Sequence, residues 1–407
     1  MFNEITGGVC AAQGFKAGGV HCGVKATSSP DKNDLAMILS EKECTAAGVY
    51  TLNRVKAAPI YVTMDHLEDG TAWGIVANSG NANACCPGSH ENAEAMCAAA
   101  AQATGREAAD FAVCSTGVIG QTINIGAIQA GMPALAASLS DDGSDLAAAA
   151  IMTTDTVKKE LAVSFSVGGR EVRLGAIAKG SGMIHPNMGT MLCFITTDCA
   201  ITLELLEDAL RDTAQKTFNR VTVDGDTSTN DTCVILANGM AGNPLIEWKD
   251  EGYAAFKEAL DHVCRQLARS IAGDGEGAGK LVTCRITGAR SEESAERLAK
   301  AVVGSSLVKA AMCGADANWG RVMAAMGYSK APFRPEHVDI SFASEAGSVL
   351  VCRQGDGVPF DEAKATEILS QKEAVIAVNL NEGDDSAECW GCDLTAEYVR
   401  INGDYRS

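Results

Sequence analysis

Hydrophobic residues recur along the chain with two different periods, which predict interleaved helices and strands. Between Phe256 and Ile271 an apolar residue returns every three or four positions, which is the stripe of an amphipathic helix. The segment 203–218 repeats this pattern with Leu203, Leu206 and Leu210. Both segments are therefore expected to be helices that turn one face toward a core.

Short apolar runs between turn-forming residues predict strands. Eight such runs occupy residues 58–64, 73–79, 172–179, 191–198, 232–239, 280–288, 338–343 and 374–380. A stretch rich in Asn, Gly and Ser at 77–94 predicts a long loop that leads into an Ala-rich helix. Because helices and strands do not alternate one for one, we expect a mixed α+β/α/β fold: layered mixed β-sheets sandwiched by helices.

The chain is longer than a single core usually supports, so two or more lobes are expected. The run "GDGEGAGK" (273–280) ends a predicted helix, and a strand–helix–strand pattern follows, which predicts a smaller C-terminal lobe from about residue 281. This run is not a phosphate-binding loop. A Walker A motif needs glycine and a hydroxyl residue where Asp274 and Leu281 stand.

Composition narrows the class of protein. A net charge of −19 argues against a nucleic-acid or membrane-surface partner. The first residues lack the pattern of a signal peptide, and no apolar tract is long enough to span a membrane, so we expect a cytoplasmic protein. In that compartment the sixteen scattered cysteines are expected to be reduced residues of the core. The one CxxC, "CWGC" at 389–392, lacks a second ligand pair, and neither a metal nor an organic cofactor is predicted.

The stretch "KGSGMIHPNMGTML" (179–192) places Gly189 directly before Thr190, at the expected start of a buried strand. A threonine hydroxyl needs a base to become a nucleophile. If the chain is cut before Thr190, the freed α-amine, with a reference pKa of about 7.7–8.0, supplies that base. Gly189 would relieve crowding at the attacked carbonyl. From these residues alone, a plain Gly-Thr turn between strands is an equally good interpretation.

The stretch also resembles the signature of the ornithine acetyltransferase family, the bifunctional glutamate N-acetyltransferase/amino-acid acetyltransferase of arginine biosynthesis. Seven of the other blocks that share the resemblance are "GGVCAAQGFKAGGVHCGVK", "ANSGNANAC", "VCSTGVIG", "AIMTTDT", "TVDGDTSTNDT", "CGADANWGRV" and "GCDLTAEYVRINGDYRS". The resemblance implies a self-processing N-terminal-nucleophile fold shared with related aminopeptidases. It also implies cleavage between Gly189 and Thr190 into an α chain, 1–189, and a β chain, 190–407, assembled as a heterotetramer with two copies of each.

Further roles follow from the same resemblance. Thr190 would be the nucleophile that takes the acetyl group of N-acetylornithine and passes it to glutamate, while Thr116 and Gly117 would form the oxyanion hole. Besides Thr190, the matching substrate contacts are Thr153, Lys179, Glu276, Asn402 and Ser407. Lys179 would neutralise an α-carboxylate. Glu276 would receive the cationic ornithine side chain or assist proton transfer. A structural ion pair between Lys179 and Glu276 is the alternative interpretation.

Two positions depart from the family. Gly189 stands where alanine is usual, which leaves the rate of maturation open, and Ser407 replaces a terminal threonine but keeps the hydroxyl. Use of acetyl-CoA as a second donor also stays open. The alternative functions are a related self-processing aminopeptidase or amidohydrolase, and a processed binding protein without activity.

Overall fold

The structure is a computed structural model that describes residues 2–25, 29–185 and 191–404. Its contacts divide the chain into two compact units. Unit 1 consists of the described parts of Met1–Gly180, Pro186–Asn219 and Thr227–Leu267. Unit 2 consists of the described parts of Ser181–His185, Arg220–Asp226 and Ala268–Ser407. This division differs from the predicted cut between residues 189 and 190, which stays a prediction.

Unit 1 is built on one nine-stranded sheet. Its strands, in spatial order, are β1 (Phe2–Ile5), β6 (Lys159–Val167), β7 (Arg170–Lys179), β8 (Leu192–Thr197), β9 (Thr232–Ala237), β3 (Leu35–Tyr50), β4 (Thr71–Asn78) and β5 (Phe111–Ser115), while β2 (Phe15–Val20) pairs with β3. The β4–β5 and β8–β9 pairs are parallel, and the other pairs are antiparallel.

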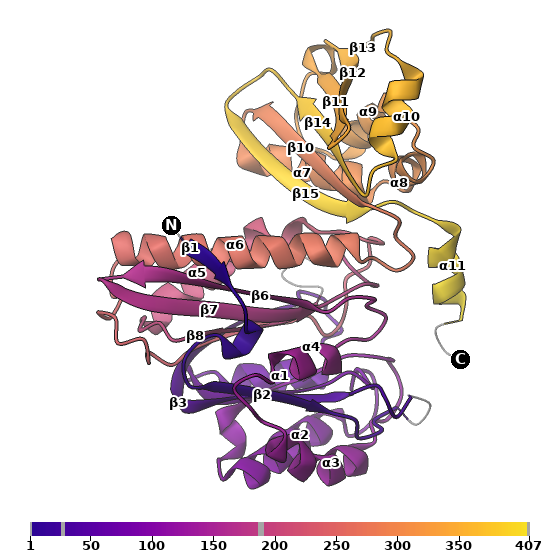
Figure 1. Cartoon of the computed structure of the whole chain (residues 1–407). Helices are drawn as coiled ribbons and strands as arrows, with labels where there is room; N and C mark the ends of the chain where they lie inside the picture. Colours follow the sequence, from indigo (N-terminus) through magenta and orange to yellow (C-terminus); the bar gives the residue numbers. More distant parts are fainter. Residues whose placement is uncertain (1, 26–28, 186–190, 405–407) are drawn as a thin grey trace. The chain divides into compact units, whose positions relative to one another are not determined.

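The long strand β3 joins two layers of this sheet (Figure 1). Its register against β4 shifts between Leu39 and Cys44. The part before the shift pairs with β2 and β4, and the part from Thr45 onward pairs with β9. A register shift of this kind bends a strand, so one strand can serve both layers. Ile38 of β3, Ile177 of β7 and Phe194 of β8 belong to the buried cluster that the two layers enclose.

Helices cover both outer faces of unit 1 (Figure 1). On the side of β6, β7 and β8 lie α5 (Leu203–Lys216) and the first part of α6 (Glu251–Gly273), and on the side of β2 and β3 lie α1 (Ala58–His66), α2 (Ser89–Thr104) and α3 (Ile125–Ala137). The short helix α4 (Ser144–Ala150) packs on β2, β3 and β7. The predicted class of layered mixed sheets sandwiched by helices is confirmed.

Most of the predicted elements are confirmed, but the strand expected at residues 58–64 is wrong, because this segment forms α1. Pro59 stands in the first helical turn, where its missing N–H costs nothing. The Thr63 hydroxyl donates to the Val113 carbonyl at 2.7 Å and accepts from the Val113 N–H at 2.8 Å. Val113 lies on β5, the edge strand, so α1 satisfies an edge that would otherwise be unpaired.

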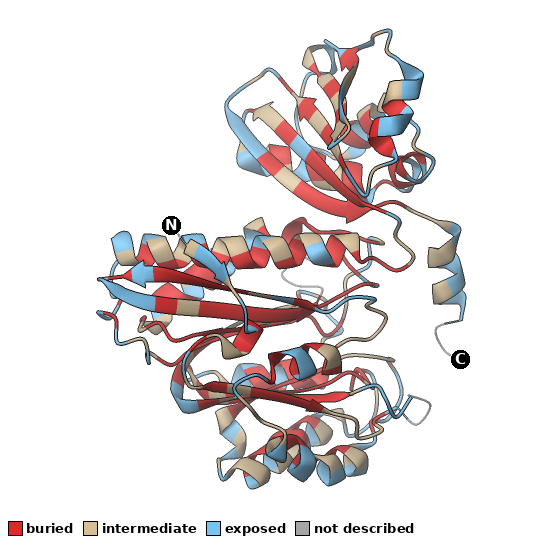
Figure 2. Ribbon diagram, viewed as in Figure 1, coloured by how far each residue is buried: buried red, intermediate tan, exposed pale blue. Residues whose placement is uncertain are grey.

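Unit 2 has a six-stranded sheet with the order β13, β12, β11, β14, β10, β15. The strands are β10 (Leu281–Ala289), β11 (Asp339–Ser344), β12 (Gly347–Arg353), β13 (Asp356–Gly357), β14 (Glu373–Asn379) and β15 (Asp385–Cys392). The helices are α7 (Glu292–Gly304), α8 (Ser306–Cys313), α9 (Trp319–Tyr328), α10 (Glu362–Leu369) and α11 (Ala396–Gly403). Unit 2 has its own buried cluster, in which α7 packs on β10 and β15 (Figure 2).

The sixteen cysteines are free thiols, and most of them are buried, in keeping with their predicted place in the core. Cys389 and Cys392 of the CxxC lie on β15, where the Lys309 Nζ donates to the Cys392 sulfur at 3.3 Å. Within the part of the chain that the structure describes, no cluster of three or more His, Cys, Asp or Glu side chains is arranged to hold a metal ion. No helix in that same part is long and apolar enough to cross a membrane.

One tight contact gives a test of the packing in unit 1. A Cβ on Gly175 of β7 would lie 1.8 Å from the Gly8 carbonyl oxygen, a backbone atom that cannot swing away as a side chain could. We expect Gly175→Ala to lower the free energy of unfolding by about 3 kcal/mol, as overpacking does. The measurement is the urea midpoint followed by circular dichroism. Gly126→Ala, at an exposed glycine with open surroundings in α3, is the control and should leave the midpoint unchanged or slightly higher.

Candidate active site

Two of the predicted site residues meet at strand ends in unit 1. Lys179 is the last residue of β7 and is buried, and its Nζ lies 3.4 Å from the Thr116 Oγ1. Thr116 directly follows β5. Lys179 also pairs with Leu192, the first residue of β8, two positions after Thr190 in the sequence. The ammonium group is therefore held beside a hydroxyl close to where the second predicted chain would begin.

The turn that carries Thr116 and Gly117 is shaped by the loop after β4. The Thr116 N–H donates to the Asn78 carbonyl at 2.9 Å, and Asn81 forms bridges with both Thr116 and Val118. Gly117 has a φ of 134°, and a Cβ there would lie 2.8 Å from the Asn81 nitrogen. Only glycine fits this position without strain. The backbone of the predicted oxyanion turn is thus fixed by neighbours on both sides.

Asp155 organises this part of the site, although the sequence analysis did not single it out. Its Oδ1 accepts from the Lys159 Nζ at 2.8 Å and from the Gly180 N–H at 2.7 Å, and its Oδ2 accepts from the Thr153 N–H at 3.1 Å. The side chains of Asp155 and Lys159 are fully buried. The available signal was an aspartate two residues after Thr153 and four before a lysine, inside a block already matched to the family.

The charge on Asp155 results from two opposed effects. Burial alone would raise its pKa, but Lys179 and Lys159 and the hydrogen bond from Gly180 outweigh burial and lower the pKa to about 2. The carboxylate is therefore ionised at neutral pH. It holds the Thr153 backbone, the residue after β7 and one of the two lysines in a single network.

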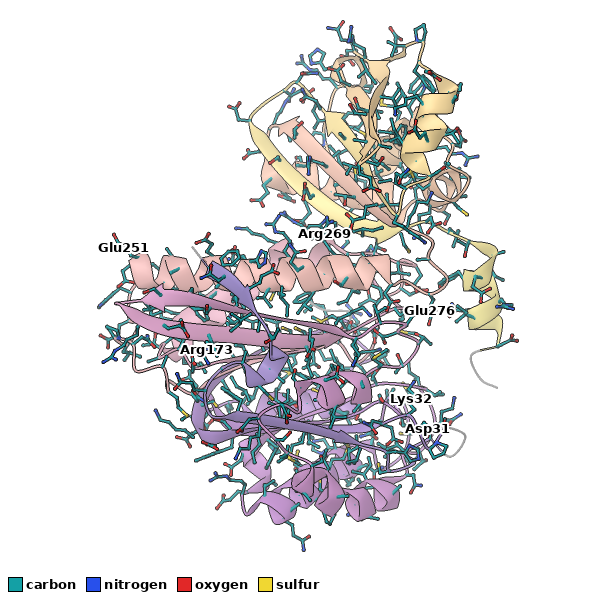
Figure 3. All side chains as sticks on the ribbon, viewed as in Figure 1. Asp31, Lys32, Arg173, Glu251, Arg269 and Glu276 are labelled. Carbon is teal, nitrogen blue, oxygen red and sulfur yellow. The ribbon has the colours of Figure 1, made fainter. Side chains whose placement is uncertain are left out.

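Two other predicted residues meet in unit 2. The Asn402 Nδ2, on α11, donates to the Glu276 Oε2 at 2.7 Å, and Glu276 is buried. The Glu276 N–H donates to the Ser181 carbonyl at 3.0 Å. A Cβ on Gly182 would lie 2.3 to 2.4 Å from the Glu276 carboxylate atoms. The glutamate, labelled in Figure 3, is thus packed directly on the backbone that precedes the predicted cleavage point.

That backbone is itself anchored within unit 2. Asp224 accepts from the N–H groups of Met183 and Ile184 at 2.6 and 2.9 Å, and the Val223 N–H donates to the Ile184 carbonyl at 2.6 Å. The Ser181 hydroxyl donates to the Asp274 carbonyl at 2.7 Å. Three residues that precede the Gly189–Thr190 bond in the sequence, Ser181, Met183 and Ile184, are therefore held in place.

His185 is the next residue of this anchored segment, and its surroundings favour a structural role over acid–base chemistry. Its Nδ1 lies 3.0 Å from the Thr222 Oγ1. Burial, assisted by the charge of Lys300, lowers the pKa of His185 to about 4. The imidazole is therefore neutral near pH 7 and positions the chain through its hydrogen bond.

Gly189, Thr190 and Ser407 lie outside the described residues, so their roles stay predictions. Of the other predicted residues, Lys179 and Thr116 are in contact, Thr153 joins them through Asp155, and Glu276 and Asn402 are in contact. Lys179 belongs to unit 1 and Glu276 to unit 2. Asp155 and Asp224 are the two organising groups that sequence reasoning missed.

Residues 16–407 match the ArgJ family. The arginine biosynthesis bifunctional protein ArgJ of Symbiobacterium thermophilum is 49% identical over 405 residues, which cover 99% of both chains. ArgJ 1 of Clostridium acetobutylicum is 47% identical, over 97% of this chain and 96% of the relative. A crystal structure of the argJ protein from Bacillus halodurans is 45% identical, with a TM-score of 0.51, and covers 53% of this chain and 99% of that one. The chain therefore belongs to the ArgJ family, as the resemblance predicts, and is an acyltransferase of arginine biosynthesis.

Proposed function

We propose that the enzyme transfers the acetyl group of N2-acetyl-L-ornithine to L-glutamate through an acetyl ester on Thr190. The Thr190 hydroxyl attacks the acetyl carbonyl while its own α-amine takes the proton. The α-amine then gives this proton to the leaving nitrogen, so the C–N bond breaks and L-ornithine leaves as the free amine. The amine of glutamate then attacks the ester, which gives N-acetyl-L-glutamate and restores the hydroxyl. The observation that carries the proposal is the buried Lys179 ammonium, held beside the Thr116 hydroxyl at the end of β7.

Unit 1 supplies groups for the anionic parts of the reactants. The Lys179 ammonium suits the α-carboxylate that donor and acceptor share. The Thr116 hydroxyl and the Gly117 N–H would donate to the oxygen that gains charge in the tetrahedral intermediate. One such donor contributes about 2.7–4 kcal/mol of transition-state stabilisation. The rigid turn around Gly117 supports this role because preorganised donors need no rearrangement during the reaction.

Unit 2 supplies a carboxylate for the cationic end of ornithine. The Asn402 amide donates to one oxygen of Glu276, which leaves the other oxygen able to accept from a substrate ammonium group. Assistance in proton transfer is the other role open to Glu276. Ser407 is proposed as a further substrate contact.

Maturation by cleavage between Gly189 and Thr190 is part of the proposal. The anchored segment 181–185 supports it, because holding the chain that precedes the Gly189–Thr190 bond favours attack of the Thr190 hydroxyl on the Gly189 carbonyl. The comparisons add support. This chain matches 99% and 96% of the length of the relatives from Symbiobacterium and Clostridium. The chain in the Bacillus crystal structure is shorter: 99% of it matches only 53% of this chain. Residues 190–407 make up slightly more than half of the sequence.

The description of the relatives as bifunctional supports a second activity. We propose that this activity is acetylation of glutamate with acetyl-CoA as the donor, on the same Thr190. The proposed reaction needs no metal or organic cofactor, and the proposed assembly has two α and two β chains in the cytoplasm.

Cleavage is tested by intact mass spectrometry of the denatured protein. The wild type should give two chains, 1–189 and 190–407, and Thr190→Ala should give one uncut chain without transferase activity. Thr202→Ala is the control, since the Thr202 side chain makes no cap bond to α5, and it should be cut normally. A wild-type chain that stays uncut and still transfers acetyl would rule out the terminal amine as the base.

The buried Asp155 should make stability depend on acid pH. Its folded-state pKa of about 2 lies below the ordinary value of 3.8, so its contribution is complete above about pH 4 and is lost as pH falls toward 2. Asp155→Asn should lower the urea midpoint near neutral pH, because it removes the carboxylate that neutralises buried Lys159, at a cost of about 3–5 kcal/mol. The difference between the two proteins should shrink between pH 4 and 2. An equal difference at every pH would contradict the assignment.

The packing of Glu276 on Gly182 should affect the donor substrate. Gly182→Ala pushes a methyl group into the Glu276 carboxylate, so we expect kcat/KM for N-acetylornithine to fall about tenfold, as when one charged contact is misplaced. Gly327→Ala, at an exposed glycine of α9 in unit 2 with open surroundings, is the control. Steady-state assays give kcat/KM for each variant, and the midpoint of thermal unfolding shows whether the variant is folded. An unchanged kcat/KM in a folded Gly182→Ala enzyme would argue against the role of Glu276.

A further inference from the structure

The loop between β2 and β3 brings another lysine, Lys32, to the network of unit 1. Its Nζ donates to the Thr153 carbonyl at 2.7 Å. The loop is held at this point by its own bonds, since the Lys32 N–H donates to the Ser29 carbonyl and the Lys32 carbonyl lies 2.7 Å from the His21 Nδ1. Figure 3 labels Lys32 on this loop. The sequence analysis gave Lys32 no role, and the proposed mechanism does not use it.

The contact with Thr153 leaves the charge of Lys32 uncancelled, because a carbonyl is a neutral acceptor. Partial burial lowers the pKa of the Lys32 ammonium, whereas Asp155 and Asp34 raise it and Lys25 lowers it. Asp34 uses its carboxylate on two backbone N–H groups, those of Cys22 and Val24. Lys32 is an exposed residue, so an anion from solution can reach its ammonium group.

Asp155 cannot neutralise the lysines around it. Its carboxylate is engaged by Lys159 in a fully buried pair, and Lys179 and Lys32 both lie within the electrostatic range of the same carboxylate. Counting Asp34, which also acts on Lys32, two carboxylates face the three ammonium groups of Lys32, Lys159 and Lys179. The site has more ammonium groups than a substrate with a single carboxylate needs, because Lys179 alone suits that group.

The two substrates of the proposed reaction differ in the number of carboxylates that they carry. N-acetylornithine carries one carboxylate and a cationic side chain, whereas glutamate carries a second carboxylate on its side chain. We propose that Lys32 binds the γ-carboxylate of the acceptor glutamate, while Lys179 binds its α-carboxylate, so that Lys32 makes the acceptor step specific for a dicarboxylate. This inference rests on the proposed acetyl transfer.

The charge of the side chain also distinguishes the donor from the acceptor. The ornithine side chain is a cation, which Lys32 repels and a carboxylate such as Glu276 attracts. The glutamate side chain has the opposite preference. Donor and acceptor can then both place their α-carboxylate against the Lys179 ammonium and still be distinguished by the charge of their side chains.

The test compares Lys32→Gln with the wild type in the full processed enzyme. Glutamine at this position can still donate to the Thr153 carbonyl but carries no charge. We expect the KM for glutamate to rise about tenfold or more, which is the scale of one charge-assisted contact, while the KM for N-acetylornithine stays within about twofold. The ratio of kcat/KM for glutamate over glutamine as acceptor should fall by a similar factor.

Two more variants complete the test. Lys32→Arg keeps the charge and should recover most of the preference for glutamate. Lys158→Gln removes a surface lysine of unit 1, which pairs with exposed Asp145, and should behave as the wild type. Release of ornithine from N-acetylornithine without any acceptor should be the same in Lys32→Gln and the wild type, because the donor step does not use Lys32.

Several outcomes would overturn the inference. An equal loss with both substrates, or an unchanged ratio of glutamate to glutamine, would mean that Lys32 only supports the Thr153 carbonyl. A raised KM for acetyl-CoA alone would mean that Lys32 binds a phosphate instead. A wild-type enzyme that transfers no acetyl group at all would refute the proposed function first, which separates that failure from a failure of Lys32.

Discussion

The buried carboxylate of Asp155 is the constraint on which the unit 1 site depends. It is surrounded by N–H and ammonium donors, and it ties the Thr153 backbone, the end of β7 and Lys159 to one point. A buried charge is tolerated only when it is paired and hydrogen-bonded, and this one is both. The same charge also stabilises the buried ammonium of Lys179. The proposed binding of a substrate carboxylate by Lys179 thus depends on a residue that need not touch the substrate.

Close approach of backbone to side chain is the second requirement, and glycine meets it in both units. Gly117 lets the turn after β5 lie against Asn81, and Gly182 lets the chain lie against the Glu276 carboxylate. At Gly117 a methyl group would collide with the backbone of Asn81, and at Gly182 it would collide with the Glu276 carboxylate.

The errors of sequence reasoning have physical causes. Residues 58–64 are rich in apolar and β-branched side chains, which favours a strand, yet they form α1 because Thr63 satisfies the edge of β5. Asp155 and Asp224 were overlooked because one aspartate among many in an acidic chain carries only a weak local signal. Their importance comes from partners that are distant in sequence, such as Gly180 for Asp155 and Met183 for Asp224.

The sequence by itself determined the periodic helices α5 and α6, most of the strands that it predicted, the layered fold class and the family. These features depend on local periodicity and on motifs, which are written in consecutive residues. Only the tertiary structure decided which groups meet: Lys179 with Thr116, Glu276 with Asn402 and Gly182, and Lys32 with Thr153. The partners in these contacts are 63 or more residues apart in the chain, up to 126. Strand pairing and burial, rather than any local preference, select such contacts and set the charge that each group carries.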